Sequence, residues 1–134
     1  MAANLDQRRA FRYPEWKDRY ELVATVTSAI HCANFVEKDQ TYVFSLDGIL
    51  DPDKSTANLC LGMLARLQPA LLMAADRATL GAHPVSSGWQ TFDCYDTGLD
   101  HGGMGKVCVR LTLRDRASGE PVADAAAAEE EVNR

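Results

Sequence analysis

Cysteine thiols and one adjacent imidazole are the side chains of this sequence best suited to bind a metal ion or to act as nucleophiles. Cys32 directly follows His31. Cys60 lies near the start of an apolar stretch, and Cys94 follows Phe92 in a short apolar segment. Thiolate sulfur and imidazole nitrogen are good ligands for zinc and iron. A first hypothesis is therefore a zinc or iron site formed by Cys32, Cys60, Cys94 and His31.

The same thiols allow two other interpretations. The cysteines contain no C-x-x-C pair, so their spacing gives no support to a zinc ribbon. Thiol catalysis needs a histidine, a cation or a helix N-terminus beside the sulfur, and Cys32 and Cys60 each meet one such condition. A free cysteine on an apolar helix face is also a common core residue. Metal binding, thiol chemistry and plain core packing are thus three alternatives.

Two alternating segments are expected to position the first of these cysteines. From Tyr20 to Ile30 apolar and polar residues alternate and β-branched residues are frequent, which predicts a strand that ends just before Cys32. Residues 41–46 repeat the pattern with apolar side chains on one face, and an Asp-Gly pair supplies the turn that ends this second strand.

The apolar stretch 57–75 is expected to be a helix that carries Cys60 near its start. Its apolar residues recur at helical spacing and form a stripe that faces the sheet, including Met63, Leu64 and Leu67. Pro69 lacks a backbone N–H and clashes with the preceding turn, which predicts a kink or a break near Gln68.

Two further strands follow this helix. The segment "WQTFDC" predicts a short third strand that ends at Cys94, and "KVCVRLTL" predicts a fourth whose valines and leucines face inward. By alternation Cys108 shares the opposite face with Lys106, so it is not expected to meet the other cysteines. The predicted fold is α+β, in the order strand, strand, helix, strand, strand: a small antiparallel sheet with a kinked helix on one face.

The loop 95–105 contains four glycines together with Asp100 and His101. Glycine permits close backbone approaches and conformations that other residues avoid. The loop joins two strands and does not open a helix, so it is not a dinucleotide-binding fingerprint. It is either a solvated hairpin loop or a loop that inserts Asp100 and His101 into a partner or a pocket.

The two ends of the chain differ in composition from its middle. Residues 1–19 form a polar arm with interspersed aromatic residues, Phe11, Tyr13 and Trp16. This arm either packs on its own domain or embraces another subunit. The tail 117–134 has no aromatic anchor and carries like charges near its end, so it is expected to be flexible.

Length and composition indicate a single α+β domain over residues 20–116. The 134 residues are 46% hydrophobic and 25% charged, and no run approaches the about 20 apolar residues of a membrane span. The net charge of −5 repels nucleic acid and anionic lipid, so neither nucleic acid nor membrane is an expected partner. The N-terminus lacks the apolar segment of a secretory signal, which predicts a cytoplasmic protein with reduced cysteines.

Several short motifs resemble a family of short, uncharacterised prokaryotic proteins with three spaced cysteines. The segment "YELVATV" matches the family's opening strand Y-x-V-x-V-T-V, and Cys32 matches the cysteine of C-P-x-G-H-x-x-G-D. The segment "LCLGMLARLQP" matches a helix beginning I-C-x-x-A-L-x-x-L-x-P, and "CYD" matches a later C-P-D. Ala33 replaces the proline, the G-H pair is absent, and the glycine loop is an insertion. The resemblance covers roughly residues 20–113 and implies a compact α+β domain whose three cysteines belong together, but no activity.

No polar constellation in the sequence is typical of a self-sufficient active site. We therefore expect a small non-catalytic subunit or interaction domain, associated with a larger cytoplasmic enzyme or with copies of itself. Its expected contact residues lie in the arm and the glycine loop: Phe11, Tyr13, Trp16, Asp100 and His101. The alternative is a metal-binding or thiol-dependent protein that uses Cys32, Cys60 and Cys94.

Overall fold

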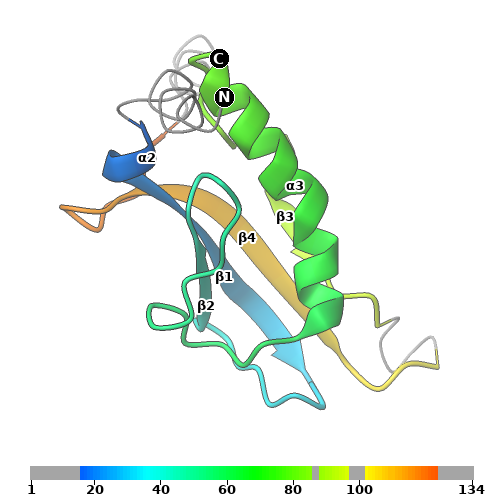
Figure 1. Cartoon of the computed structure of the whole chain (residues 1–134). Coiled ribbons are helices and arrows are strands. Elements are labelled where there is room, and N and C mark those ends of the chain that lie inside the picture. Colours follow the sequence, from blue (N-terminus) through cyan, green and yellow to red (C-terminus); the bar gives the residue numbers. More distant parts are fainter. Residues whose placement is uncertain (1–15, 86–87, 97–101, 124–134) are drawn as a thin grey trace, which may run out of the picture.

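The computed structural model describes residues 16–85, 88–96 and 102–123, and of Trp16 and Lys17 only the backbone. Figure 1 shows an open sheet with one long helix along one of its faces. In chain order the elements are α2 (Trp16–Arg19), β1 (Tyr20–Ile30), β2 (Thr41–Phe44), α3 (Leu61–Thr79), β3 (Thr91–Asp93) and β4 (Lys106–Asp115).

The sheet is antiparallel, with strand order β2-β1-β4-β3. Its centre is the long pairing of β1 with β4, which extends from Tyr20 opposite Asp115 to Ile30 opposite Lys106, with a bulge between Val26 and Ser28. The prediction of a mixed α+β fold with a small antiparallel sheet is confirmed. The element order differs from the prediction because the short helix α2 precedes the first strand.

Helix α3 begins later than the apolar stretch 57–75 predicted. The backbone N–H of Ala57 donates to the carbonyl of Thr41 at 3.1 Å, and the carbonyl of Asn58 accepts the hydroxyl of Tyr42 at 2.7 Å. These bonds hold the segment against the start of β2, so the helix starts only after Cys60, which is its N-cap residue. The expected position of this cysteine at the helix start is therefore observed.

The predicted kink near Gln68 is wrong. Helix α3 continues without a break through Pro69 to Thr79. Pro69 has no N–H to donate to the carbonyl of Ala65, four residues earlier. Both residues are exposed, so water can donate a hydrogen bond to this carbonyl instead. The helix ends where Gly81 adopts a φ of 75°, with the paired backbone hydrogen bonds of a Schellman motif.

The core lies between α3 and one face of the sheet. The inward residues predicted for the fourth strand, Val107, Val109, Leu111 and Leu113, are all buried, as are Met63 and Leu67 of the helix. Leu64 is half-buried and packs against the edge of this core. The opposite face of the sheet is more polar and carries Arg110 and Thr91, both exposed.

A buried charge lies on this second face, near the start of β1. Glu21 is 4% exposed. One of its carboxylate oxygens accepts two hydrogen bonds from the Arg114 guanidinium at 2.7 and 2.9 Å, and the other accepts one from Lys54 at 3.0 Å. Burial raises the pKa of Glu21, but the hydrogen bonds and positive charges of Lys54 and Arg114 outweigh it and hold the pKa below its usual value.

Part of the expected tail returns along β4. The backbone N–H of Val122 donates to the carbonyl of Leu113 at 2.8 Å, and Pro121 forms a bridge with Arg114. Val122 also packs against the core. Within the described part of the chain, no helix is both long and apolar enough to cross a membrane.

Candidate functional site

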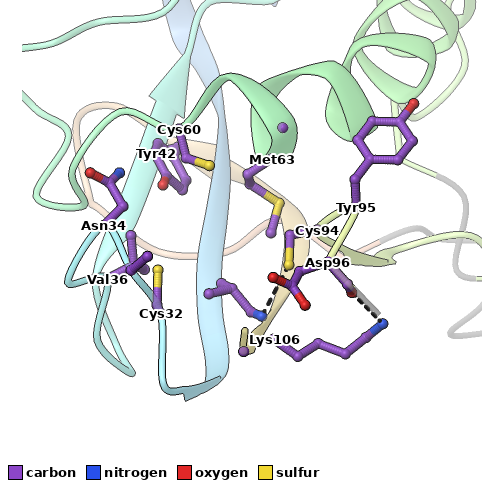
Figure 2. Close-up of a pocket in the computed structure, with 14 residues that line it drawn as sticks. Cys32, Asn34, Val36, Tyr42, Cys60, Met63, Cys94, Tyr95, Asp96 and Lys106 are labelled. Atoms are coloured by element: carbon purple, nitrogen blue, oxygen red, sulfur yellow. Dashed lines mark hydrogen bonds between the residues drawn. The ribbon is translucent and has the colours of Figure 1, made fainter. Parts of the chain in front are cut away.

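An apolar pocket of about 190 Å³ lies at one end of the sheet. Its walls come from the loop after β1, from the start of α3, and from the chain on either side of the β3–β4 connection. Figure 2 shows Cys32, Asn34 and Val36 on the first of these segments, Cys60 and Met63 on the second, and Cys94 and Asp96 on the third.

The structure brings Cys32, Cys60 and Cys94 to this one pocket. All three thiols are free and half-buried. Cys108 is not among the lining residues, in agreement with its expected place on the other face of the sheet. Burial raises the pKa of the Cys108 thiol, and the nearby Asp93 carboxylate raises it further, so this thiol is poorly suited to act as a nucleophile.

His31 does not line the pocket with the thiols. It is exposed, and its backbone has a φ of 53°. Among the described residues, no three His, Cys, Asp or Glu side chains are grouped closely enough to hold a metal ion together. The zinc or iron site therefore stays a prediction from the sequence, without a ligand group in the part of the chain that the structure describes.

A reciprocal pair of asparagines joins two walls of the pocket. The Asn58 side-chain amide donates to the carbonyl of Asn34 at 2.9 Å. The Asn34 amide donates to the carbonyls of Leu59 at 2.8 Å and Asn58 at 3.3 Å. The loop after β1 is thereby attached to the residues that precede α3, and the distance between Cys32 and Cys60 is fixed by this attachment.

Tyr42 forms the buried end of the pocket. The residue is fully buried, and its hydroxyl donates to the Asn58 carbonyl at 2.7 Å. Burial raises the pKa of Tyr42 to about 12, with further contributions from the charges that Cys60 and Cys32 would carry as thiolates. Tyr42 is therefore a neutral hydrogen-bond donor at physiological pH.

The third wall is held by hydrogen bonds around the β3–β4 connection. The Cys94 sulfur accepts the backbone N–H of Val107 at 3.3 Å. The Asp96 carboxylate accepts the backbone N–H of Met104 at 3.1 and 3.2 Å. The Lys106 ammonium donates to the Asp96 carbonyl at 3.2 Å and lies 3.6 Å from the Asp93 carboxylate.

Gly105 lets this wall approach the end of β1. A Cβ atom on Gly105 would lie at clash distance from the carbonyl oxygens of His31 and Ile30. No side chain can be placed at such distances, so glycine is the residue that fits here. Gly102 in the same loop has a φ of 83°, a conformation that also favours glycine.

The polar groups that line the pocket are engaged with the protein itself. The described part of the chain contains no buried side-chain nitrogen or oxygen without a hydrogen-bond partner. The lining of the pocket is mainly apolar, and its polar residues Tyr42, Asn34 and Asp96 form hydrogen bonds within the protein. Such a pocket selects an occupant by shape and apolarity.

Large exposed apolar residues lie next to the lining residues in the chain. Phe35 stands between lining residues Asn34 and Val36, and Leu61 stands between Cys60 and Gly62. We call the following five exposed residues the rim: Phe35 (80% exposed), Leu59 (55%), Leu61 (83%), Tyr95 (64%) and Met104 (70%). Tyr95 lines the pocket itself, and the Arg66 guanidinium lies 5.1 Å from the centre of its ring. Leu59 precedes the lining residue Cys60, and Met104 precedes the lining residue Gly105.

The sequence analysis missed the rim, and it also missed Tyr42 and Asn34. A signal was present, because each of the three cysteines has a large apolar residue close to it in sequence: "CANF", "LCL" and "CY".

The contact residues that the sequence predicted in the arm and the glycine loop cannot be compared with the structure. Phe11, Tyr13, Asp100 and His101 lie outside the described residues, as does the side chain of Trp16.

Comparisons with known proteins add no family to this description. Neither the family models, nor the curated proteins, nor the solved structures that were compared with this chain gave a match.

Proposed function

We propose that this chain is a small non-catalytic interaction domain that binds its partner at the pocket and the rim. The observation that supports the proposal is an apolar pocket whose lining residues have five large exposed apolar residues among them or next to them in the chain. Large apolar patches are uncommon on the surface of monomeric proteins and are typical of interaction sites. A partner would place one apolar side chain in the pocket and cover the rim.

The internal hydrogen bonds of the pocket favour binding over catalysis. Tyr42 and Asn34 direct their donors to backbone carbonyls, and Asp96 accepts a backbone N–H. These groups hold the walls in place, and general acid–base chemistry would require at least one of them to face a substrate. A preformed pocket of this kind reduces the entropy cost of binding.

Thiol chemistry in the pocket is the second candidate. It is favoured by the placement of Cys32, Cys60 and Cys94 along one pocket. The resemblance to short prokaryotic proteins with three spaced cysteines also implies that these cysteines belong together. Metal analysis of the purified protein, repeated with Cys60→Ser, tests the metal-binding form of this candidate, since bound metal should be lost with the thiol while the domain stays folded.

The interaction function can be tested by purification of the tagged full-length protein from its native host. The informative variant is Leu61→Glu, which puts a charge on the rim at the first turn of α3. Its matched control is Leu72→Glu on the same helix, where the leucine is 65% exposed but does not flank the pocket. Glutamate is a good helix former, so both variants should keep the helix.

We expect the wild type and Leu72→Glu to retain the same partner and Leu61→Glu to lose it. Loss of the partner from both variants, or retention by both, would contradict the proposal. Far-UV circular dichroism of the two variants checks that the helix is intact in each.

A further inference from the structure

The most exposed aromatic side chain of the rim is held in an unusual backbone conformation. Phe35 is 80% exposed and has a φ of 58°, a left-handed conformation that bulky residues rarely adopt. The turn is held by a hydrogen bond from the Phe35 N–H to the carbonyl of Cys32 at 3.1 Å and by the bonds of the neighbouring Asn34. A strained backbone that projects a ring into water indicates a functional role for that ring.

The adjacent pocket has the size and chemistry to accept such a ring. Its volume is about 190 Å³, whereas an apolar cavity of about 150 Å³ is enough to bind benzene. Its walls include Val36, Met63 and Val107, and the thiols add polarizable sulfur, which makes favourable contacts with aromatic rings. The phenyl ring of Phe35 has no hydrogen-bonding group, and the mainly apolar lining of the pocket does not require one from its occupant.

The geometry points to a second copy of this chain as the partner: we propose that two copies form a symmetric dimer in which each Phe35 enters the pocket of the other. This inference rests on the proposed function and names its partner. Phe35 lies next to its own pocket in the chain, between Asn34 and Val36. A two-fold rotation about an axis between ring and pocket places each ring over the other copy's pocket, which is the self-complementarity that a symmetric dimer requires.

The available area agrees with a stable dimer. With the exposed fractions given above, the five rim residues present on the order of 700 Å² of surface, close to the about 800 Å² that each partner contributes to a standard protein–protein interface. Phe35 would be the central anchor of the interface, and its neighbours would exclude water around it.

Sedimentation equilibrium of the full-length protein and two variants tests this dimer. Phe35→Asn removes the ring and keeps the fold, because asparagine tolerates the left-handed conformation. Cys60→Phe keeps the ring and fills the pocket. The wild type should dimerise in the micromolar range or tighter, and each variant should raise the dissociation constant by about 100-fold or more, because the contact occurs twice.

An equimolar mixture of the two variants is the decisive sample. Phe35→Asn retains an open pocket and Cys60→Phe retains the ring, so the mixed dimer has one intact contact while neither homodimer has any. We expect the mixture to associate more tightly than either variant alone. If Cys60→Phe does not fold, the dissociation constants of the wild type and of Phe35→Asn still test the proposed dimer.

A wild type that stays monomeric up to millimolar concentration overturns the dimer, and so does a dimer unaffected by Phe35→Asn. Neither outcome overturns the proposed function by itself. If the wild type is monomeric and Leu61→Glu abolishes its binding to a native partner, the rim binds a different protein and only the dimer is overturned. If the wild type is monomeric and binds no native partner, both proposals are overturned.

Discussion

Asn34 and Asn58 hold the pocket together through reciprocal bonds, each side-chain amide donating to the backbone carbonyl of the other at 3.3 and 2.9 Å. The loop after β1 has no regular structure of its own between His31 and Gln40. Its position relative to α3 therefore depends on these bonds. The same loop carries both Cys32 and Phe35, so the pocket and its most exposed ring share this support.

Asn34→Asp is the first test of this role. The aspartate keeps the size of the side chain but loses the donors to Leu59 and Asn58 and turns an oxygen toward two carbonyls. We expect the free energy of unfolding to fall by about 0.5–1.5 kcal/mol, the net contribution of a typical hydrogen bond, because these bonds are open to solvent. Urea unfolding measures this change. An unchanged unfolding midpoint would contradict the role given to Asn34.

Gly105 and Gly62 form a matched pair of glycine substitutions. In Gly105→Ala the new methyl group meets the carbonyls of His31 and Ile30, so the free energy of unfolding should fall by about 1–3 kcal/mol. In Gly62→Ala it lies 3.9 Å from the Cys60 sulfur, so the first turn of α3 should gain about 0.5–1 kcal/mol. Thermal unfolding shows whether each variant is more or less stable than the wild type. Equal changes in stability in the two variants would contradict the close approach at Gly105.

Glu21 makes the stability of the fold depend on pH. The pKa of Glu21 is lower in the folded protein than its reference value of 4.5, because Lys54 and Arg114 outweigh the effect of burial. Its contribution is therefore fully present above the unfolded-state pKa and is lost as the pH falls through the lower folded-state pKa. Glu21→Gln should remove this part of the acid dependence and lower stability at pH 7 by about 1–3 kcal/mol.

The measurement for Glu21 is urea unfolding of wild type and Glu21→Gln between pH 7 and pH 3. The difference between the two proteins should shrink as the pH falls. Glu37→Gln serves as control because Glu37 is exposed and should have little effect. A difference that stays constant with pH would show that the ion pairs do not set the acid dependence.

Tyr42 gives a second pH dependence at the alkaline end. The pKa of Tyr42 is raised to about 12, first by burial and then by the charges of Cys60 and Cys32. A raised pKa means that its contribution is fully present below the unfolded-state value near 10 and is lost as the pH rises toward 12. The stability difference between wild type and Tyr42→Phe should therefore narrow over this range, and a difference that is already absent at pH 7 would contradict the bond to Asn58.

The sequence predicted the parts of the fold that depend on periodicity. Alternation identified the inward residues of β4 and separated Cys108 from the other thiols, because side chains on a strand alternate between two faces. The position of Cys60 at a helix start also agreed with the structure. The start of α3 was misplaced because the bonds of Ala57 and Asn58 to β2 are long-range and leave no local pattern in the sequence.

The effect of Pro69 could not be predicted from the sequence. Proline was expected to interrupt α3, but an exposed proline on a long helix leaves a carbonyl to which water can donate a hydrogen bond, so the exposure of the helix decided the outcome.

The site was less predictable than the fold. The rim was missed because exposure is a property of the folded surface. Helical spacing places Leu61, which is 83% exposed, off the buried stripe that contains Leu67, but it does not show which parts of the folded surface lie next to Leu61.

The central claim is that the pocket binds an apolar side chain, and toluene, which corresponds to the side chain of phenylalanine, tests it most directly. The measurement is a titration of the ¹⁵N-labelled protein with toluene, followed by amide chemical shifts. The account predicts saturable shifts at pocket residues such as Val36, Met63 and Val107, with Thr91 and Arg110 on the opposite sheet face unchanged. No saturable shift at the pocket, or shifts of equal size on both faces, would contradict it.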